Sequence, residues 1–181
     1  GPAAAQEGPP VFIAETRAAM HAAPGGTFIG ALPAGTKPIE ASAVADGWIR
    51  TILRERDVWI PLDALAPLEP RMIGGGLLPD GLSCIGAEPS WTIAFDGGTV
   101  SVTRPGLRPE ALRTLGGGRA QGRRFPVRVT LARETGEVGD LLVEPRLCSD
   151  TMSDRSYPWT ATLVLRDGPL LTGCCRLPRA R

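Results

Sequence analysis

Short apolar runs separated by turn residues recur along the whole chain. In the first half these runs are VFIAE at 11–15, TFIGAL at 27–32, WIRTIL at 48–53 and VWIPL at 58–62. In the second half they are SWTIAF at 90–95, GTVSVT at 98–103, PVRVTLA at 126–132, DLLVEP at 140–145, WTATLVL at 159–165 and PLLTGCC at 169–175. Runs of this length with turns between them predict short β-strands in a barrel or a sandwich.

The details of the pattern support strands more than helices. In the stretch TATLVLRDG, Ala161, Leu163 and Leu165 alternate with threonine, valine and arginine, the period of two that a strand with two different faces requires. The turns FDGG and RDGP contain Asp-Gly, which suits hairpins. One short helix is predicted over Arg108–Gly116, with Pro109 near its start and glycine at its end. We therefore expect an all-β protein with one minor helix.

The same pattern divides the chain into two domains. Residues 1–10, GPAAAQEGPP, have no periodicity and are interpreted as a flexible leader, whose first two residues are typical of the remnant of a cleaved tag. The glycine-rich segment at 70–79 is predicted to be a linker between a first domain at 11–69 and a second at 80–178. We expect few contacts between the domains, so that each folds independently.

The charge of the chain argues against a nucleic-acid partner, and its hydrophobicity argues against a transmembrane helix. Twenty Lys and Arg against nineteen Asp and Glu give a net charge of +1, which is no electrostatic footprint for nucleic acid. The chain contains no apolar run long enough for a transmembrane helix. Each half of the chain is small for burying a stable core alone, so covalent crosslinks would help it.

The four cysteines indicate the compartment. Cys84, Cys148, Cys174 and Cys175 form no C-x-x-C pair, which argues against a zinc site and for two disulfides, with three connectivities open. Disulfides persist in oxidising compartments, so we expect a periplasmic or extracellular protein. We also expect that a natural signal peptide or lipid-anchored cysteine of the precursor has been removed.

The first half resembles the bacterial SH3-like domain, a five-stranded barrel of exported proteins. The matching stretches, in the family's order, are AAMHAAP at 18–24, IGALPAGTKPIE at 29–40, DGWIRT at 46–51 and DVWIPLDAL at 57–65. The chain departs from the family at His21, where arginine is usual, and at Ala23 and Val58, where glycine is usual. The resemblance implies binding of cell-wall peptides, glycans or a protein partner.

Two tryptophans are the candidate binding residues of this domain. Trp48 and Trp59 could line a shallow groove, since an aromatic face with a polar edge suits peptides and sugars. The alternative, that both rings belong to the core of the barrel, stays open. His21 is the sole histidine and has no adjacent partner, so no catalytic or ligating role is expected of it.

The second half resembles a family of uncharacterised exported bacterial domains often found on lipoproteins, and more distantly the META/HslJ-type domains and periplasmic lysozyme-inhibitor barrels. The matching stretches are GAEPSW at 86–91, CSDTMSDRSYPWTATLVL at 148–165 and LTGCCR at 171–176. Because the Cys-x-Asp motif and the terminal Gly-Cys recur together in that family, the resemblance implies a Cys148–Cys174 disulfide and leaves Cys84 with Cys175. Adjacent cysteines on a strand point to opposite faces, so they should reach different partners.

The segment after Cys148 has several interpretations. A stapled turn that satisfies its own polar groups, with Asp150 as an acceptor for backbone N–H groups, is favoured over a calcium loop or a serine hydrolase site. A glycosidase pair of Glu88 and Asp150 would need a separation that sequence does not show. The remaining alternative is a recognition loop that presents Arg155, Tyr157 and Trp159 to a partner.

The glycine run LGGGRAQGRRF at 115–125 lacks the Gly-Lys-Ser/Thr ending of a phosphate-binding loop. We predict a mobile basic hairpin there, with solvated arginines.

These observations predict a non-enzymatic binding protein of the cell envelope that engages peptidoglycan or an envelope protein. The alternatives are a periplasmic inhibitor of a lysozyme-like hydrolase and an envelope-assembly or stress lipoprotein. No catalytic residue, no metal and no cofactor are expected, because the single histidine and the expected pairing of all cysteines leave no evident reactive cluster.

Overall fold

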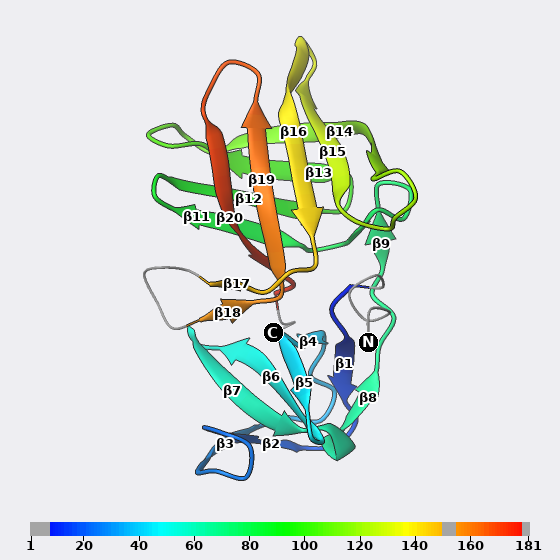
Figure 1. Cartoon of the computed structure of the whole chain (residues 1–181), viewed down its shortest axis with the longest axis vertical. Helices are drawn as coiled ribbons and strands as arrows, with labels where there is room; N and C mark the ends of the chain where they lie inside the picture. The colour runs from blue at the N-terminus through cyan, green and yellow to red at the C-terminus, as the bar shows by residue number, and fades with distance from the viewer. Residues whose placement is uncertain (1–7, 150–154, 179–181) are drawn as a thin grey trace.

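A computed structural model describes residues 8–149 and 155–178, and this part of the chain is all-β (Figure 1). Residues 1–7 of the expected leader lie outside it. Its one helical element is a single 3-10 turn, η1 (Leu62–Ala64). None of the described residues belongs to a helix long and apolar enough to cross a membrane.

The first domain consists of two small sheets (Figure 1). The larger sheet has the order β3-β2-β7-β6-β5 and the smaller one the order β4-β1-β8. Their strands are β1 (Val11–Ala14), β2 (Ala18–His21), β3 (Phe28–Leu32), β4 (Ile39–Glu40), β5 (Ala43–Ala45), β6 (Trp48–Leu53), β7 (Arg56–Pro61) and β8 (Leu65–Pro67). The core between the sheets is made of small and aliphatic side chains with one phenylalanine: Phe12, Ala14, Ala18, Met20, Leu32, Ile39, Ala41, Ile49, Val58 and Ile60.

The second domain is a closed antiparallel barrel, which resolves the choice between barrel and sandwich. Its strands follow one another around the barrel in chain order, and β20 pairs with β11 to close it. They are β11 (Ser83–Ala87), β12 (Ser90–Asp96), β13 (Thr99–Thr103), β14 (Glu110–Arg119), β15 (Val127–Arg133), β16 (Gly136–Glu144), β19 (Trp159–Leu165) and β20 (Leu170–Arg176). A small hairpin, β17 (Cys148–Ser149) and β18 (Ser156–Tyr157), is inserted between β16 and β19.

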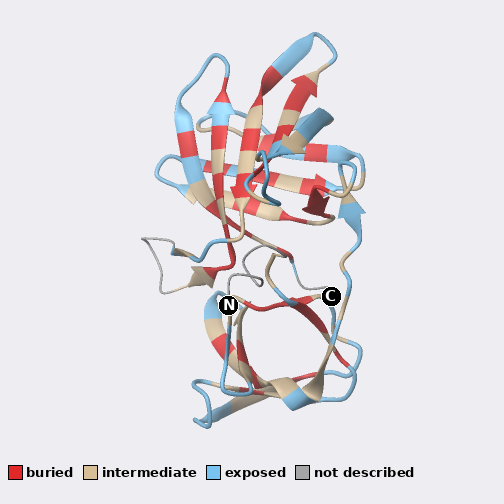
Figure 2. Cartoon of the chain, turned by 45° about the vertical axis from the view of Figure 1, so that its right-hand side comes forward, coloured by how far each residue is buried: buried red, intermediate tan, exposed pale blue. Residues whose placement is uncertain are grey.

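Side chains fill the interior of the barrel. Bands of buried residues alternate with less buried ones in the barrel (Figure 2), and along β12 and β19 every second residue is buried in the core. Trp91 is the largest fully buried side chain, and its indole N–H donates to the carbonyl of Thr172 at 3.1 Å. The barrel core is therefore a packed interior built around aromatic and branched side chains.

The predicted helix over Arg108–Gly116 is wrong, because this segment contributes to β14. Glu110–Arg119 pairs with β13 on one side and β15 on the other, with a bulge between Thr114 and Gly116. Leu112 is buried between two exposed neighbours, the alternation of a strand. Pairing on both edges outweighs the weak helical propensity of so short a segment.

The predicted linker at 70–79 is also more structured than expected. It contains the hairpin of β9 (Met72–Ile73) and β10 (Leu78–Pro79). Leu77 and Leu78 are buried in the core cluster of the barrel. The glycines between the two short strands form the turn, and the apolar residues after them attach the segment to the second domain.

Candidate binding surface

The outer face of the larger sheet in the first domain carries a line of aromatic side chains. Phe28, His21, Trp59 and Arg50 are consecutive cross-strand partners across β3, β2, β7 and β6. Trp48 precedes Arg50 by two residues and shares its face. We call these five residues the aromatic row. Their sheet neighbours of opposite parity, such as Ile49, point into the core, which fixes the row on the outside.

The rings of the aromatic row contact one another. The imidazole of His21 lies edge-on to Trp48, with ring centroids 5.1 Å apart, and edge-on to Phe28 at 6.1 Å. The Nδ1 atom of His21 is 2.8 Å from the carbonyl oxygen of Gly26, a hydrogen bond that orients the imidazole. Phe28 is 59% exposed. Trp48 and Trp59 are half-buried and do not belong to the core of the first domain, so the alternative that both are core residues is wrong.

One end of the aromatic row is polar and reaches the second domain. The guanidinium of Arg50 lies 5.8 Å from the ring centre of Trp59, and its Nε donates to the hydroxyl of Ser42 at 3.0 Å. Asp57 lies 4.0 Å from the same Nε and accepts the backbone N–H of Ser156, on β18, at 3.3 Å. Thus the β17–β18 hairpin borders the charged end of the row.

The structure separates the remaining candidate binding residues from the aromatic row. Tyr157 and Trp159 are 2% and 3% exposed. They are therefore interior residues and not rings presented to a partner. Arg155 lies 4.0 Å from Glu55, in the turn between β6 and β7, and so also contributes to the contact between domains.

Both disulfides implied by the resemblance are confirmed. Cys84 and Cys175 are register partners on β11 and β20, with Cα atoms 4.0 Å apart, and both lie in the barrel core. Cys148 is bonded to Cys174, with Cα atoms 5.5 Å apart, and ties the β17–β18 hairpin to the other face of β20. The expected stapled turn is thus present at its base, while Asp150 and the rest of residues 150–154 lie outside the described part. The two disulfides indicate an oxidising compartment.

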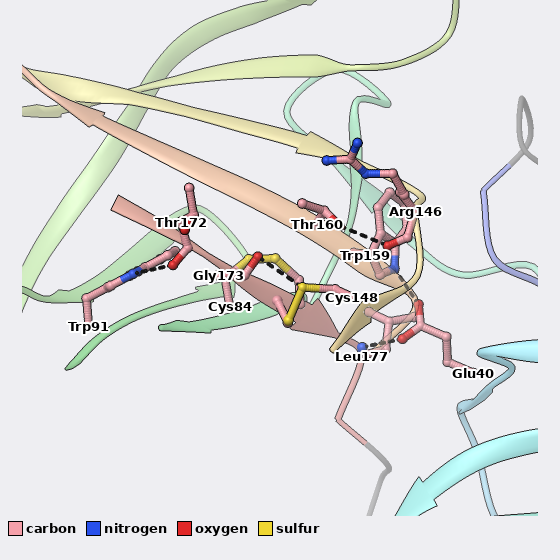
Figure 3. The surroundings of a disulfide bond; sticks show 12 residues. Glu40, Cys84, Trp91, Arg146, Cys148, Trp159, Thr160, Thr172, Gly173 and Leu177 are labelled. Carbon is pink, nitrogen blue, oxygen red and sulfur yellow. Dashed lines mark hydrogen bonds between the residues drawn. A yellow bond between two sulfur atoms is a disulfide. The ribbon is translucent and has the colours of Figure 1, made fainter. Parts of the chain in front are cut away.

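A buried carboxylate, which the sequence did not single out, joins the two domains. Glu40 on β4 accepts the indole N–H of Trp159 at 2.7 Å with one oxygen and the backbone N–H of Leu177 at 2.7 Å with the other (Figure 3). It is 6% exposed. The expectation of few contacts between the domains is not met, since Val11, the register partner of Glu40, also packs in the barrel core cluster.

A cavity of about 250 Å³ lies beside Glu40 between the domains. Its first-domain wall includes Met20 and Leu53, and its second-domain wall includes Pro158 and Arg176. Burial raises the pKa of the Glu40 carboxyl to about 7, although the hydrogen bonds from Leu177 and Trp159 and the charge of Arg176 act in the opposite direction.

No group of three or more His, Cys, Asp or Glu side chains that could hold a metal ion occurs among the described residues. Glu40 is the sole buried acidic side chain in that part of the chain, and both of its oxygens accept protein N–H groups. This arrangement suits a structural carboxylate. A general acid or base would need a free oxygen directed at a substrate.

Sequence reasoning found two members of the aromatic row and missed three. Phe28 and Arg50 stand in ordinary strand patterns, and their significance follows only from the register that aligns them with Trp59. His21 was noted as a departure from the resembling family but given no role. The one signal in the sequence was that His21 stands where the resembling family usually has arginine, within a motif of the same domain as the two tryptophans.

Comparison with known proteins identifies no relative. No protein-family model, no curated protein and no solved structure matches the chain.

Proposed function

We propose that the protein is a non-enzymatic cell-envelope binding protein that holds peptidoglycan on the aromatic row. The observation that carries the proposal is the row itself, in which aromatic rings lie exposed or half-buried on the outer face of a sheet and end at the Arg50 and Asp57 pair. Aromatic faces pack against sugar rings and peptide stems, and the charged end can bind their polar groups.

The setting of the row supports this assignment. It lies on the domain that resembles the bacterial SH3-like domain, and that resemblance implies binding of the cell wall. The two disulfides agree with a periplasmic location, to which a lipid anchor on the precursor would add attachment to the membrane. The second domain, with its crosslinked barrel, serves as the support.

The test is co-sedimentation of the purified protein with insoluble peptidoglycan. We expect binding by the wild type and at least tenfold weaker binding by Trp59→Ala, because loss of a central aromatic anchor commonly costs more than about 1.4 kcal/mol. Leu170→Ala is the matched control, since Leu170 is 66% exposed but lies on the barrel. It should bind as the wild type does.

Three results would overturn the proposal. Equal sedimentation of Trp59→Ala and the wild type would place the binding surface elsewhere. Absence of sedimentation together with inhibition of a lysozyme by the wild type would favour the inhibitor hypothesis. Release of soluble fragments from the peptidoglycan would contradict the assignment as a non-enzymatic protein.

A further inference from the structure

The cavity between the domains has an aliphatic wall on the side of the first domain. This wall is made of side chains that belong to the core of that domain or pack against it: Met20, Leu32, Ile39, Leu53 and Val58. Val58 and Trp59 are neighbours on β7 and point to opposite faces of the sheet, so the cavity lies on the inner face, away from the aromatic row. It therefore offers apolar surface that the proposed peptidoglycan site does not use.

Two arginines line the same cavity. Arg54 belongs to the turn between β6 and β7, and Arg176 to β20. Arg54 is exposed, whereas Arg176 is half-buried and its guanidinium lies 6.0 Å from the ring centre of Tyr157. Neither guanidinium forms a hydrogen bond or an ion pair with another side chain or with the backbone in the described part of the chain. A half-buried cation without a counter-ion favours the binding of an anion.

The acidic groups nearby do not neutralise these arginines. Among the described residues that line the cavity, Glu40 is the only acidic one, and both of its oxygens already accept N–H groups. The charge of Arg176 acts on this carboxyl, but no ion pair joins the two groups. Glu55, which follows Arg54 in the chain, lies 4.0 Å from Arg155 instead. With two arginines against one glutamate, the lining remains positively charged even when Glu40 is ionised.

A second cavity adjoins the first and adds to the positive charge. Its volume is about 260 Å³, and it shares four lining residues with the first cavity: Met20, Leu32, Leu53 and Arg54. Arg56 is the charged group that it adds, and no acidic side chain occurs among its described lining residues. Three arginines therefore lie beside apolar walls at this end of the first domain.

The cavity between the domains is accessible and has room for a small organic molecule. Arg54 and Pro178, which line it, are exposed, so a ligand can enter without any separation of the domains. An apolar cavity of about 150 Å³ admits benzene, so this one, at about 250 Å³, has room for a chain of about ten non-hydrogen atoms.

From the apolar wall and the unpaired guanidinium groups we propose that this cavity binds a small amphipathic carboxylate, a linear aliphatic chain of about eight carbons whose carboxylate lies toward Arg54 and Arg176. Burial of the chain against the aliphatic wall supplies hydrophobic free energy, and guanidinium groups bind carboxylates through charge-assisted hydrogen bonds. A carboxylate is favoured over a phosphate because its three atoms leave more of the cavity to the chain. This ligand is distinct from the peptidoglycan assigned to the aromatic row.

The test is titration of the full chain with octanoate, followed by the NMR signals of the methyl groups of Met20 and Val58, which line the cavity. We expect these signals to shift with a Kd of about 1 mM or lower. Octanol has the same chain without the charge and should bind about tenfold more weakly, because it leaves the arginines without a counter-ion. Octyltrimethylammonium, which carries the opposite charge, should not bind.

Variants of the cavity wall test the two parts of the site separately. Arg176→Gln should weaken octanoate binding about tenfold, and Arg54→Gln only about threefold, because Arg54 is exposed. Leu53→Trp fills part of the cavity and should abolish binding, a readout that remains if Arg176→Gln fails to fold. Arg113→Gln is the matched control, since Arg113 is exposed on β14 of the barrel, and it should bind octanoate as the wild type does.

Several results would overturn the proposal. Equal affinities for octanoate and octanol would mean that the arginines play no part, and unchanged binding by Leu53→Trp would place the ligand outside the cavity. Tighter binding of octyl phosphate than of octanoate would contradict the assignment of a carboxylate. Shifts confined to exposed leucines of the barrel, such as Leu107 and Leu170, would show a non-specific apolar contact only.

Discussion

The two domains use their aromatic residues in opposite ways. The barrel buries Trp91, Phe95 and Trp159 in its core. The first domain buries Phe12 but leaves Phe28 exposed and two tryptophans half-buried on the outer face of a sheet. Large rings are the strongest single contributors to a small core, so a domain that places them outside gives up stability. Their position there is what the proposed binding function requires.

The domains also differ in how they are closed. Both disulfides lie in the second domain, and the barrel has no free strand edge between β11 and β20. The first domain has no cysteine, and its larger sheet ends in the edge strands β3 and β5. This difference indicates that the second domain is the more constrained part of the molecule, and variants of the two domains can test it.

The largest effect should come from removing the crosslink that closes the barrel. Replacement of Cys84 and Cys175 by alanine should lower the free energy of unfolding of the second domain by about 4 to 5 kcal/mol, because this disulfide spans 91 residues. Urea unfolding under non-reducing conditions measures it. Replacement of Cys148 and Cys174, which are 26 residues apart in the sequence, should cost about 3.5 kcal/mol. A loss below about 1 kcal/mol in both variants would contradict a barrel stabilised by its crosslinks.

An intermediate effect is expected from two adjacent glycines of β14. A Cβ atom at Gly117 would lie 2.1 Å from the carbonyl oxygen of Arg128 and 2.8 Å from a methyl group of Leu77, whereas at Gly118 it would meet nothing within 4 Å. Gly117→Ala should therefore lower the free energy of unfolding by about 1 to 3 kcal/mol. Gly118→Ala is the control and should stay within about 0.5 kcal/mol of the wild type. Equal stability of the two variants would mean that the glycine run is as mobile as its sequence suggested.

The smallest effect should follow from changing an exposed ring of the first domain. Phe28→Ser should alter the free energy of unfolding by less than about 0.5 kcal/mol, because Phe28 is 59% exposed and its removal leaves no cavity. Thermal unfolding followed by circular dichroism is sufficient to measure this. A loss of 2 kcal/mol or more would show that the row stabilises the domain, and the contrast between the domains would be weaker.

The strands could be predicted from the sequence because their signal is local, whereas the disulfide pairing was implied by the resemblance of the second half to a family, and the adjacency of two cysteines required only that they have different partners. Alternation along TATLVL requires no knowledge of the neighbouring strands, and adjacent Cys174 and Cys175 must point to opposite faces. The prediction of a helix over 108–116 was wrong because the conformation of this segment is determined by its pairing with β13 and β15. A local pattern of proline and glycine does not contain that information.

The candidate site was harder to predict, since it depends on long-range register. Trp48 and Trp59 were found through their residue type, but the row that they complete is defined by pairing across four strands. Glu40 was missed for the same reason. Its donors are 119 and 137 residues away in sequence, and a glutamate in the stretch KPIEAS shows no sign that it will be buried.

The crosslink between β11 and β20 has a mechanical consequence for an exported protein under tension. These are the first and last strands of the barrel. Without the disulfide, a force that pulls on the ends of the second domain would break the hydrogen bonds between them one after another. Because Cys84 and Cys175 are covalently joined, the force passes through the sulfur atoms and bypasses the ninety residues between them. Residues 84–175 therefore cannot be drawn out by such a force, and any lengthening of the molecule has to come from the segments outside them.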